Sequence, residues 1–108
     1  MTAFHRLVAT SAIGLLAAGA AWGQAFPTKT VTMVVPFTAG GPTDTVARSL
    51  AVGMTKALGQ SVVVENVGGA GGTVGATRVK NANPDGYTIL LHHIGMSTAP
   101  TLYRKLAY

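Results

Sequence analysis

The sequence predicts an α/β domain built on a parallel sheet of β-α-β-α-β order. Three observations lead to this fold class. Short runs of apolar, largely β-branched residues recur at 30–35, 61–65 and 87–91, as expected for strands buried on both faces. A segment with helical features separates each run from the next. The connections are short, and this pattern favours right-handed crossovers between parallel strands.

Proline and glycine mark the first strand and the first helix. A strand is predicted at 30–35, and Pro42 suits the first helical position, with Gly41 as its cap. Gly59 follows the last apolar residue and ends the helix. One face of this helix is indicated by apolar residues at four-residue intervals: Val46, Leu50, Met54 and Leu58.

The second half of the chain repeats this plan with shorter elements. After the strand at 61–65, a glycine-rich loop runs into a second helix, whose predicted packing face is Gly75, Val79 and Ala82. Residues 83–86 (NPDG) predict a type I turn, because proline is second and glycine fourth. The third strand follows at 87–91, then a loop at 92–97 and a short helix from Pro100.

The amino terminus has the order of a secretory signal peptide. Arg6 precedes a run without charge at 7–21, and small residues lead to Ala25. The run is shorter than the roughly 20 residues of a membrane-spanning helix. We therefore predict a signal peptide at 1–25, cleaved after Ala25 or alternatively after Gly23. Export to the periplasm of a Gram-negative cell follows, with no membrane span once the signal is removed.

Composition argues against several classes of function. The formal net charge is +5, but no basic stripe interleaved with aromatic residues is present, so nucleic-acid binding is not predicted. The chain has no cysteine, and no carboxylate cluster completes a metal site around His92 and His93, which would point to opposite sides of an extended chain. Neither of the glycine-rich nucleotide-binding motifs, G-x-G-x-x-G and G-x-x-x-x-G-K-S/T, is present. No metal and no cofactor are predicted.

The loops that follow the strands form the candidate ligand site. Ligands of parallel α/β sheets bind beyond the carboxyl ends of the strands, so the loops at 37–44, 66–73 and 92–98 should share one rim. Helix amino termini there present unpaired N–H groups and partial positive charge, and glycines allow close approach. The loops could hold a carboxylate or phosphate. Alternatively, these glycines, Gly40-Gly41 and those of 68–72, form tight turns and have no role in ligand binding.

Two polar residues near this rim have competing interpretations. Residues 95–99 (GMSTA) approximate a nucleophile elbow around Ser97, but Ala99 replaces its last glycine and no triad is indicated. Ser97 is therefore interpreted as capping a helix or lining the rim. Asp44 either stabilises the first turn of its helix through the dipole, or orients loop N–H groups or water, or accepts hydrogen bonds from a ligand amide or hydroxyl. We favour the capping role, and no catalytic residue is predicted.

Three stretches resemble the Bug family, the periplasmic solute-binding proteins of tripartite tricarboxylate transporters: FPTKTVTMVVPFTAGGPTDTVAR, GQSVVVENVGGAGGTVGA and NPDGYTILLHHIGMSTAPTLYRKLAY. The resemblance implies a type II periplasmic-binding-protein fold, in which two α/β domains close on a small carboxylate. Residues 26–108 would be a partial amino-terminal α/β domain, the first half of domain 1, with the second domain absent. The membrane components of the transporter would be its partners. The alternative is a small exported α/β enzyme acting on an anionic substrate.

The resemblance also implies which residues hold the ligand. In the family, loops of the first domain bind the carboxylate, largely through backbone N–H groups and ordered water. Thr38-Ala39 stands where the family often has proline. Carried over to this sequence, the ligand-binding residues are Phe37, Thr38, Ala39, Gly40, Gly41, Thr43, Asp44, Ala70, Gly71, Gly72, Thr73, His93 and Ser97.

Overall fold

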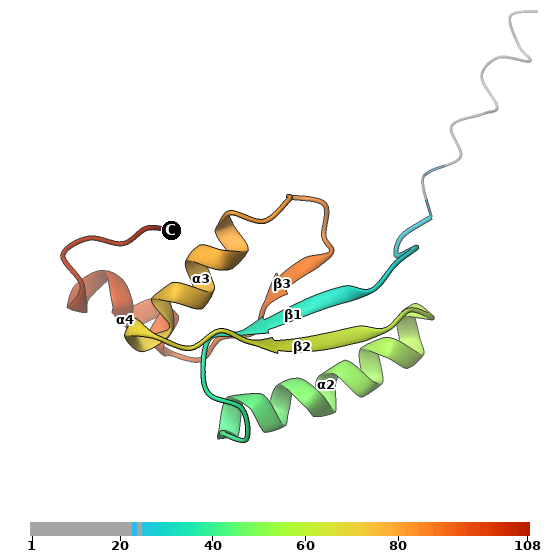
Figure 1. Ribbon diagram of the computed structural model, residues 1–108, viewed down its shortest axis with the longest axis horizontal. Coiled ribbons are helices and arrows are strands. Elements are labelled where there is room, and N and C mark those ends of the chain that lie inside the picture. Colours follow the sequence, from blue (N-terminus) through green and yellow to red (C-terminus); the bar gives the residue numbers. More distant parts are fainter. Residues whose placement is uncertain (1–22, 24) are drawn as a thin grey trace, which may run out of the picture.

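The computed structural model describes residues 23 and 25–108 (Figure 1). Residues 1–22 and 24, most of the predicted signal peptide, lie outside the described residues. The described chain forms these elements in order: β1 (Val31–Val35), α2 (Pro42–Leu58), β2 (Val62–Asn66), the short 3-10 helix η2 (Ala70–Gly72), α3 (Thr73–Lys80), β3 (Thr88–Leu90) and α4 (Gly95–Leu102). Among these residues, no helix combines the length and the apolar character needed to cross a membrane.

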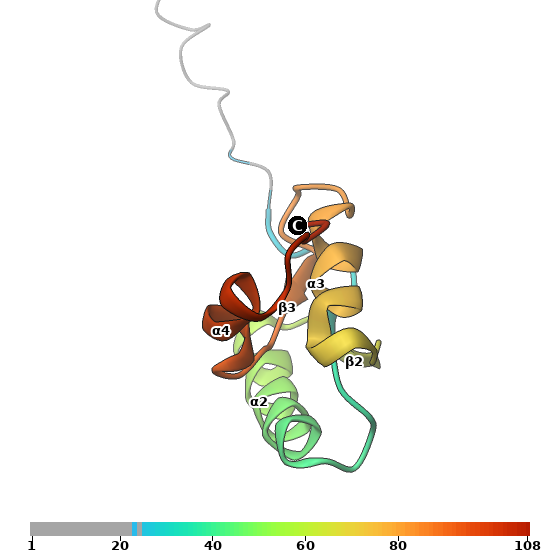
Figure 2. The same cartoon turned by 90° about the vertical axis from the view of Figure 1, so that its left-hand side faces the viewer.

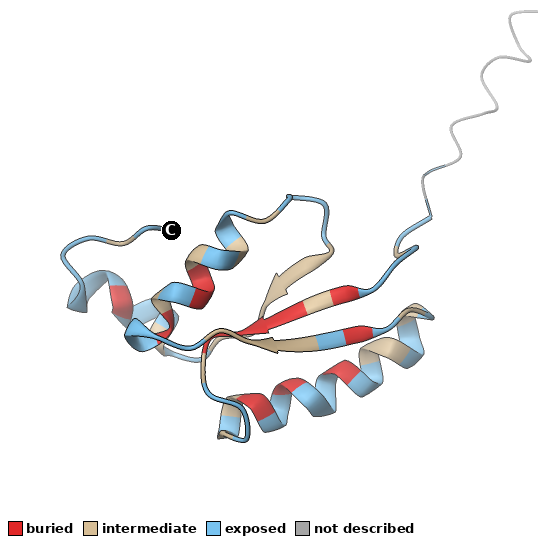
Figure 3. Ribbon diagram, viewed as in Figure 1, coloured by how far each residue is buried: buried red, intermediate tan, exposed pale blue. Residues whose placement is uncertain are grey.

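The strands form one parallel sheet of order β2-β1-β3, which confirms the predicted fold class. Val31 of β1 lies opposite Val62 of β2, and Thr32 lies opposite Thr88 of β3. Because β1 has a partner on each side, it is the most buried strand, whereas β2 and β3 are edges and more exposed (Figure 3).

Helices cover both faces of this sheet, with α2 on one face and α3 on the other (Figure 1). The apolar core lies between the sheet and α2 and consists of Val31, Met33, Val35, Ala47, Ala51 and Val62. Val34 is also fully buried, and because side chains alternate along a strand it points to the opposite face, where α3 lies.

The apolar face predicted for α2 is only half correct. Met54 and Leu58 pack against the core, but Val46 and Leu50 are 59% and 46% exposed. A step of four residues overshoots one helical turn by about 40°, so a strict four-residue row drifts around the helix. The row that faces the sheet passes instead through Ala47 and Ala51, whose small side chains let the helix lie close to the strands.

The second helix begins with the predicted glycine contact. Gly75 is buried, and a Cβ at this position would lie 2.5 Å from Pro36 Cβ. Ala76 is the other buried residue of α3, whereas Val79 is half-buried, and Ala82 lies beyond the end of the helix. The turn after α3 is tighter than a type I turn, because the Asp85 N–H donates to the Asn83 carbonyl oxygen at 2.9 Å.

The predicted loop at 92–97 and the helix start at Pro100 are wrong. Helix α4 begins at Gly95 and contains both Ser97 and Pro100. The His93 side chain explains the earlier start, since its Nδ1 accepts the Gly95 N–H at 2.9 Å. Pro100 lacks an N–H, which removes only one intrahelical hydrogen bond.

Candidate functional site

The carboxyl ends of all three strands lie on one rim of the sheet (Figure 1). Figure 2 looks towards this rim, with α4 to one side, α3 to the other and α2 below. The loops that leave the strands touch one another there. A Cβ built on Gly72 would lie 2.5 Å from His92 Nε2 and 3.2 Å from Phe37 Cζ, so the first, second and third loops meet at this point.

An aromatic cluster joins the first loop to the third. The ring of His93 stacks on Phe37, with centroids 4.2 Å apart and planes 18° from parallel. His92 meets the same phenyl ring edge-on at 5.2 Å. Beyond α4, the Tyr103 hydroxyl lies over Gly71 of the second loop, 2.6 Å from where a Cβ would stand. Of these residues, Phe37, Gly71 and His93 were predicted for the site from the sequence, whereas His92 and Tyr103 were missed.

A buried carboxylate fixes the first loop. The Asp44 side chain is 3% exposed, and its Oδ2 accepts the Gly40 N–H at 2.8 Å and Arg48 Nε at 2.9 Å. Its Oδ1 accepts Asn66 Nδ2 at 2.9 Å. The same Asn66 amide also donates to the Phe37 carbonyl oxygen, which ties the end of β2 to the first loop. We call these four residues the Asp44 network: Gly40, Asp44, Arg48 and Asn66.

The Asp44 network keeps the carboxylate ionised. The hydrogen bond from Arg48, followed by those from Gly40 and Asn66, lowers the pKa of Asp44 to about 2, although burial opposes the shift. Both carboxylate oxygens are therefore charged and occupied by donors within the protein. The structure assigns Asp44 a role in orienting the loop, through Gly40 before the helix rather than through the first helical N–H groups. Asn66 and Arg48 were missed, because only the pairing of β2 with β1 brings Asn66 to Asp44.

Several backbone donors of the rim loops, among them three at the starts of α2 and η2, remain for a ligand. Among the described residues, no hydrogen bond is found for the N–H groups of Thr43 and Asp44 at the start of α2, or for that of Gly71. The Gly72 N–H, by contrast, donates to the Gly69 carbonyl oxygen at 2.9 Å. These unpaired donors and the positive end of the α2 dipole suit an anion.

The second loop is strained where it faces the rim. Gly69, Gly71 and Gly72 have φ of 133°, 63° and 95°, and the alanine between them, Ala70, has φ of 45°. A left-handed alanine costs energy that a glycine would not, and such strain gathers at functional sites. Thr73 follows as the first residue of α3, and its N–H donates to the Ala70 carbonyl oxygen.

Several N–H groups of the third loop are already used within the protein. The N–H groups of Met96 and Ser97 donate to the His93 and Ile94 carbonyl oxygens at 3.1 Å and 3.0 Å. Ser97 is exposed, and within the described residues no hydrogen bond joins its hydroxyl to a histidine. The described part of the chain also holds no group of three metal-ligating side chains.

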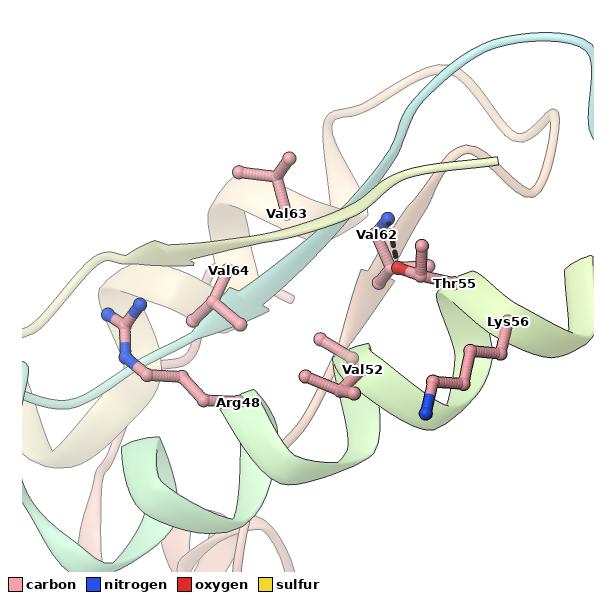
Figure 4. Close-up of a pocket in the computed structure, with 8 residues that line it drawn as sticks. Arg48, Val52, Thr55, Lys56, Val62, Val63 and Val64 are labelled. Atoms are coloured by element: carbon pink, nitrogen blue, oxygen red, sulfur yellow. Dashed lines mark hydrogen bonds between the residues drawn. The ribbon is translucent and has the colours of Figure 1, made fainter. Parts of the chain in front are cut away.

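A hollow of about 510 Å³ lies away from the rim, between α2 and the outer edge of β2 (Figure 4). Val52 and Val64 point into it from the helix and the strand, and the Val62 N–H donates to Thr55 Oγ1 at 3.0 Å beside it. The hollow is lined by Arg48, Ala51, Val52, Thr55, Lys56, Val62, Val63 and Val64. Its apolar lining makes it unlike the donor-rich rim.

Comparison with known proteins identifies similar chains. Residues 46–108 match the model of the tripartite tricarboxylate transporter family receptor. A protein encoded in the TAR-I ttuE-ttuC' intergenic region of Agrobacterium vitis is 57% identical over 85 residues, which are 79% of this chain and 25% of that protein. The chain spans between 25% and 34% of the length of the curated relatives it matches.

Solved structures give the same result. The periplasmic binding protein BugD is 64% identical, with a TM-score of 0.75 over 77% of this chain and 28% of BugD. MatC from Rhodopseudomonas palustris, with bound malate, is 56% identical, with a TM-score of 0.73 over 77% of this chain and 29% of MatC.

Proposed function

The chain belongs to the tripartite tricarboxylate transporter receptor family, and on this basis we propose that it forms part of a periplasmic solute-binding protein that captures a small carboxylate. The predicted resemblance to the Bug family is confirmed. One structural relative, BugD, is named as a periplasmic binding protein, and another, MatC, was solved with bound malate. A dicarboxylate is the ligand class we propose for the rim.

The unpaired N–H groups of Thr43, Asp44 and Gly71 are the observation that carries this proposal. They belong to loops that leave the strands at the same rim, and the adjacent carboxylate of Asp44 is already matched by donors from Gly40, Arg48 and Asn66. A ligand carboxylate would therefore meet donors there, with no unpaired acidic side chain of the network to repel it. Each such hydrogen bond contributes about 0.5–1.5 kcal/mol net.

The further parts of the proposal follow from the family. We propose a signal peptide at residues 1–25, a periplasmic location, and delivery of the ligand to the membrane components of a tripartite transporter. The protein would bind its ligand without chemical conversion. The enzymatic alternative lacks support at Ser97, because no base lies within hydrogen-bonding distance of its hydroxyl among the described residues.

Calorimetry on the purified gene product tests the proposal. The panel contains malate, the longer dicarboxylate adipate, and malamide, which keeps the shape of malate without its charges. We expect a dicarboxylate to bind and malamide to bind at least tenfold more weakly. Equal binding of malate and malamide, or no binding of either dicarboxylate, would contradict the proposal.

A matched pair of variants tests the backbone donors directly. Thr43→Pro removes one N–H group at a first-turn position where proline is tolerated, and Thr43→Ala removes the side chain but keeps the N–H. We expect Thr43→Pro to weaken dicarboxylate binding roughly 2- to 10-fold and Thr43→Ala to leave it nearly unchanged. Circular dichroism establishes that both variants fold.

A further inference from the structure

We propose that His93 positions the third loop for carboxylate binding as a neutral ring with its proton on Nε2, so that acidification weakens binding. The inference rests on the proposed function of the same rim. It concerns how that rim is held in shape and which protonation state of the ring the shape requires.

Hydrogen bonding defines the tautomer. The Gly95 N–H donates to His93 Nδ1 at 2.9 Å. A ring nitrogen that accepts a hydrogen bond carries no proton, so the proton of a neutral His93 must reside on Nε2. The bond also supplies an acceptor for the first N–H group of α4, which has no partner within the helix.

The neighbouring histidine supports the same arrangement. The His93 N–H donates to His92 Nδ1 at 2.9 Å. His92 Nδ1 also lies 3.0 Å from the His93 carbonyl oxygen, but a proton there would leave the His93 N–H facing another donor. The backbone N–H is always a donor, so the neutral ring with an unprotonated Nδ1 satisfies it.

The His93 ring connects the loops that form the rim. It stacks on Phe37 at 4.2 Å, and the Phe37 carbonyl oxygen accepts a hydrogen bond from Asn66 of the Asp44 network. His92 completes the contact to the second loop, where Gly72 leaves room for its Nε2. A change in the orientation of His93 would therefore be felt at the first loop and at the start of α4.

Protonation acts on this arrangement in a defined direction. A proton on His93 Nδ1 would place two donors 2.9 Å apart, so the bond to Gly95 must break. The titratable group in contact with the ring is His92 on the same segment, and the Tyr103 hydroxyl lies against Gly71 of the second loop. Within the described residues, no carboxylate, lysine or arginine forms a hydrogen bond or ion pair with either ring.

The opposite hypothesis gives the opposite sign. If the histidines only supplied positive charge to the rim, acidification would strengthen carboxylate binding, because hydrogen bonds from a charged ring are stronger. The structure instead uses the lone pair of Nδ1, which the charged ring does not have.

The first test measures the tautomer directly. Long-range proton–nitrogen correlation spectra of the ¹⁵N-labelled gene product at pH 7.5 distinguish the two neutral forms of each imidazole. We expect the pattern of an Nε2-protonated ring for His93. A proton on Nδ1, or a charged ring at this pH, would overturn the inference, and no variant is required.

The second test measures malate affinity at pH 7.5 and pH 5.0 in wild type, His93→Asn and His93→Gln. An asparagine oxygen can stand near the position of Nδ1 and accept the Gly95 N–H, whereas the glutamine amide reaches towards Nε2. We expect wild-type affinity to fall on the order of tenfold more than that of His93→Asn on acidification, because a second proton on the ring removes the lone pair of Nδ1. His93→Gln should bind malate several-fold more weakly than His93→Asn at pH 7.5.

The outcomes separate the inference from the proposed function. Wild-type affinity that rises on acidification relative to His93→Asn would overturn the role of the neutral ring. Absence of malate and adipate binding at both pH values would contradict the proposed function, and the tautomer measurement then decides the state of His93 alone. Circular dichroism at both pH values shows whether each variant remains folded.

Discussion

The first and third loops of the rim are held by the same kind of contact from different chemical groups. In the first loop, Asp44 Oδ2 accepts the Gly40 N–H at 2.8 Å. In the third loop, His93 Nδ1 accepts the Gly95 N–H at 2.9 Å. The carboxylate is buried and shares further donors from Arg48 and Asn66, whereas the imidazole belongs to an exposed residue.

This difference sets how far each loop can change with its surroundings. The pKa of Asp44 is lowered to about 2, so its acceptor persists at every physiological pH. A histidine ring that binds a second proton loses its free lone pair. The first loop is therefore a fixed frame for the ligand donors, and the third loop is the part that can be adjusted.

The largest expected effect comes from removing the carboxylate that fixes the frame. Asp44→Ala leaves three donors without their acceptor: the Gly40 N–H, Arg48 Nε and Asn66 Nδ2. Unsatisfied buried donors are costly, so we expect the thermal midpoint to fall on the order of 10 °C. Differential scanning calorimetry measures the fall. The control is Thr45→Ala. Thr45 follows Asp44 directly in the helix, and its hydroxyl donates to the Gly41 carbonyl oxygen in an exposed hydrogen bond.

A midpoint for Asp44→Ala close to that of Thr45→Ala would contradict the comparison. It would mean that the first loop keeps its shape without the carboxylate. The two loops would then not differ in how firmly they are held.

A smaller effect is expected from the glycines that let the loops meet. Gly72 has φ of 95°, and an added Cβ would lie 2.5 Å from His92 Nε2. Gly72→Ala should therefore destabilise the fold by about 1–3 kcal/mol, through backbone strain and overpacking. Gly41→Ser is the matched control, because Gly41 has φ of −75° and its Cβ would meet only Thr38 O at 3.4 Å.

Urea unfolding of both variants measures this difference. Serine is a favourable cap, so Gly41→Ser should lie within about 0.5 kcal/mol of wild type, as is usual for substitutions that disturb no buried contact. Equal destabilisation by the two substitutions would show that the contact between Gly72 and His92 does not hold the second and third loops together.

The boundaries of α2 could be predicted from the sequence, but the start of α4 could not. Pro42 and Gly59 act through their own backbone geometry, proline at a first helical position and glycine with φ of 69° after the last turn. Both signals are local and therefore visible in the sequence. The start of α4 depends on the His93 side chain, which accepts a hydrogen bond from the backbone N–H two residues later. Neither His93 nor its neighbours are residue types that predict this contact.

The rim, too, could be predicted from the sequence only in part. The convergence of the loops follows from parallel strand order, and the glycines and helix starts that supply the donors could be identified in advance. The Asp44 network could not, because Asn66 lies 22 residues along the chain from its partner and is brought to it only by the pairing of β2 with β1. The occupied state of the Asp44 carboxylate is a property of the folded chain.

The smallest effect at neutral pH, and the sharpest test of the frame, concerns Arg48 and the behaviour of Asp44 in acid. The pKa of Asp44 is about 2 in the folded chain, against an ordinary value of 3.8. A carboxyl group with a depressed pKa in the folded state stabilises the fold fully above its unfolded value. Its contribution is lost progressively as the pH falls from about 4 to about 2. The first loop should therefore release only in strong acid.

Arg48→Met should change this acid limit more than it changes stability at pH 7. The Arg48 side chain is 55% exposed, and ion pairs with that much solvent contact contribute under about 1 kcal/mol. Asp44 would keep its bonds to Gly40 and Asn66, but loss of the bond from Arg48, the largest cause of the low pKa, raises the pKa of Asp44. Urea unfolding between pH 7 and pH 2 should show the loss of stability beginning at higher pH. Lys56→Met, which removes the same charge from the same helix, should follow wild type. If Arg48→Met instead destabilised the fold as much as Asp44→Ala at pH 7, the arginine rather than the carboxylate would hold the first loop. The first and third loops would then be held by a cation and by a neutral ring.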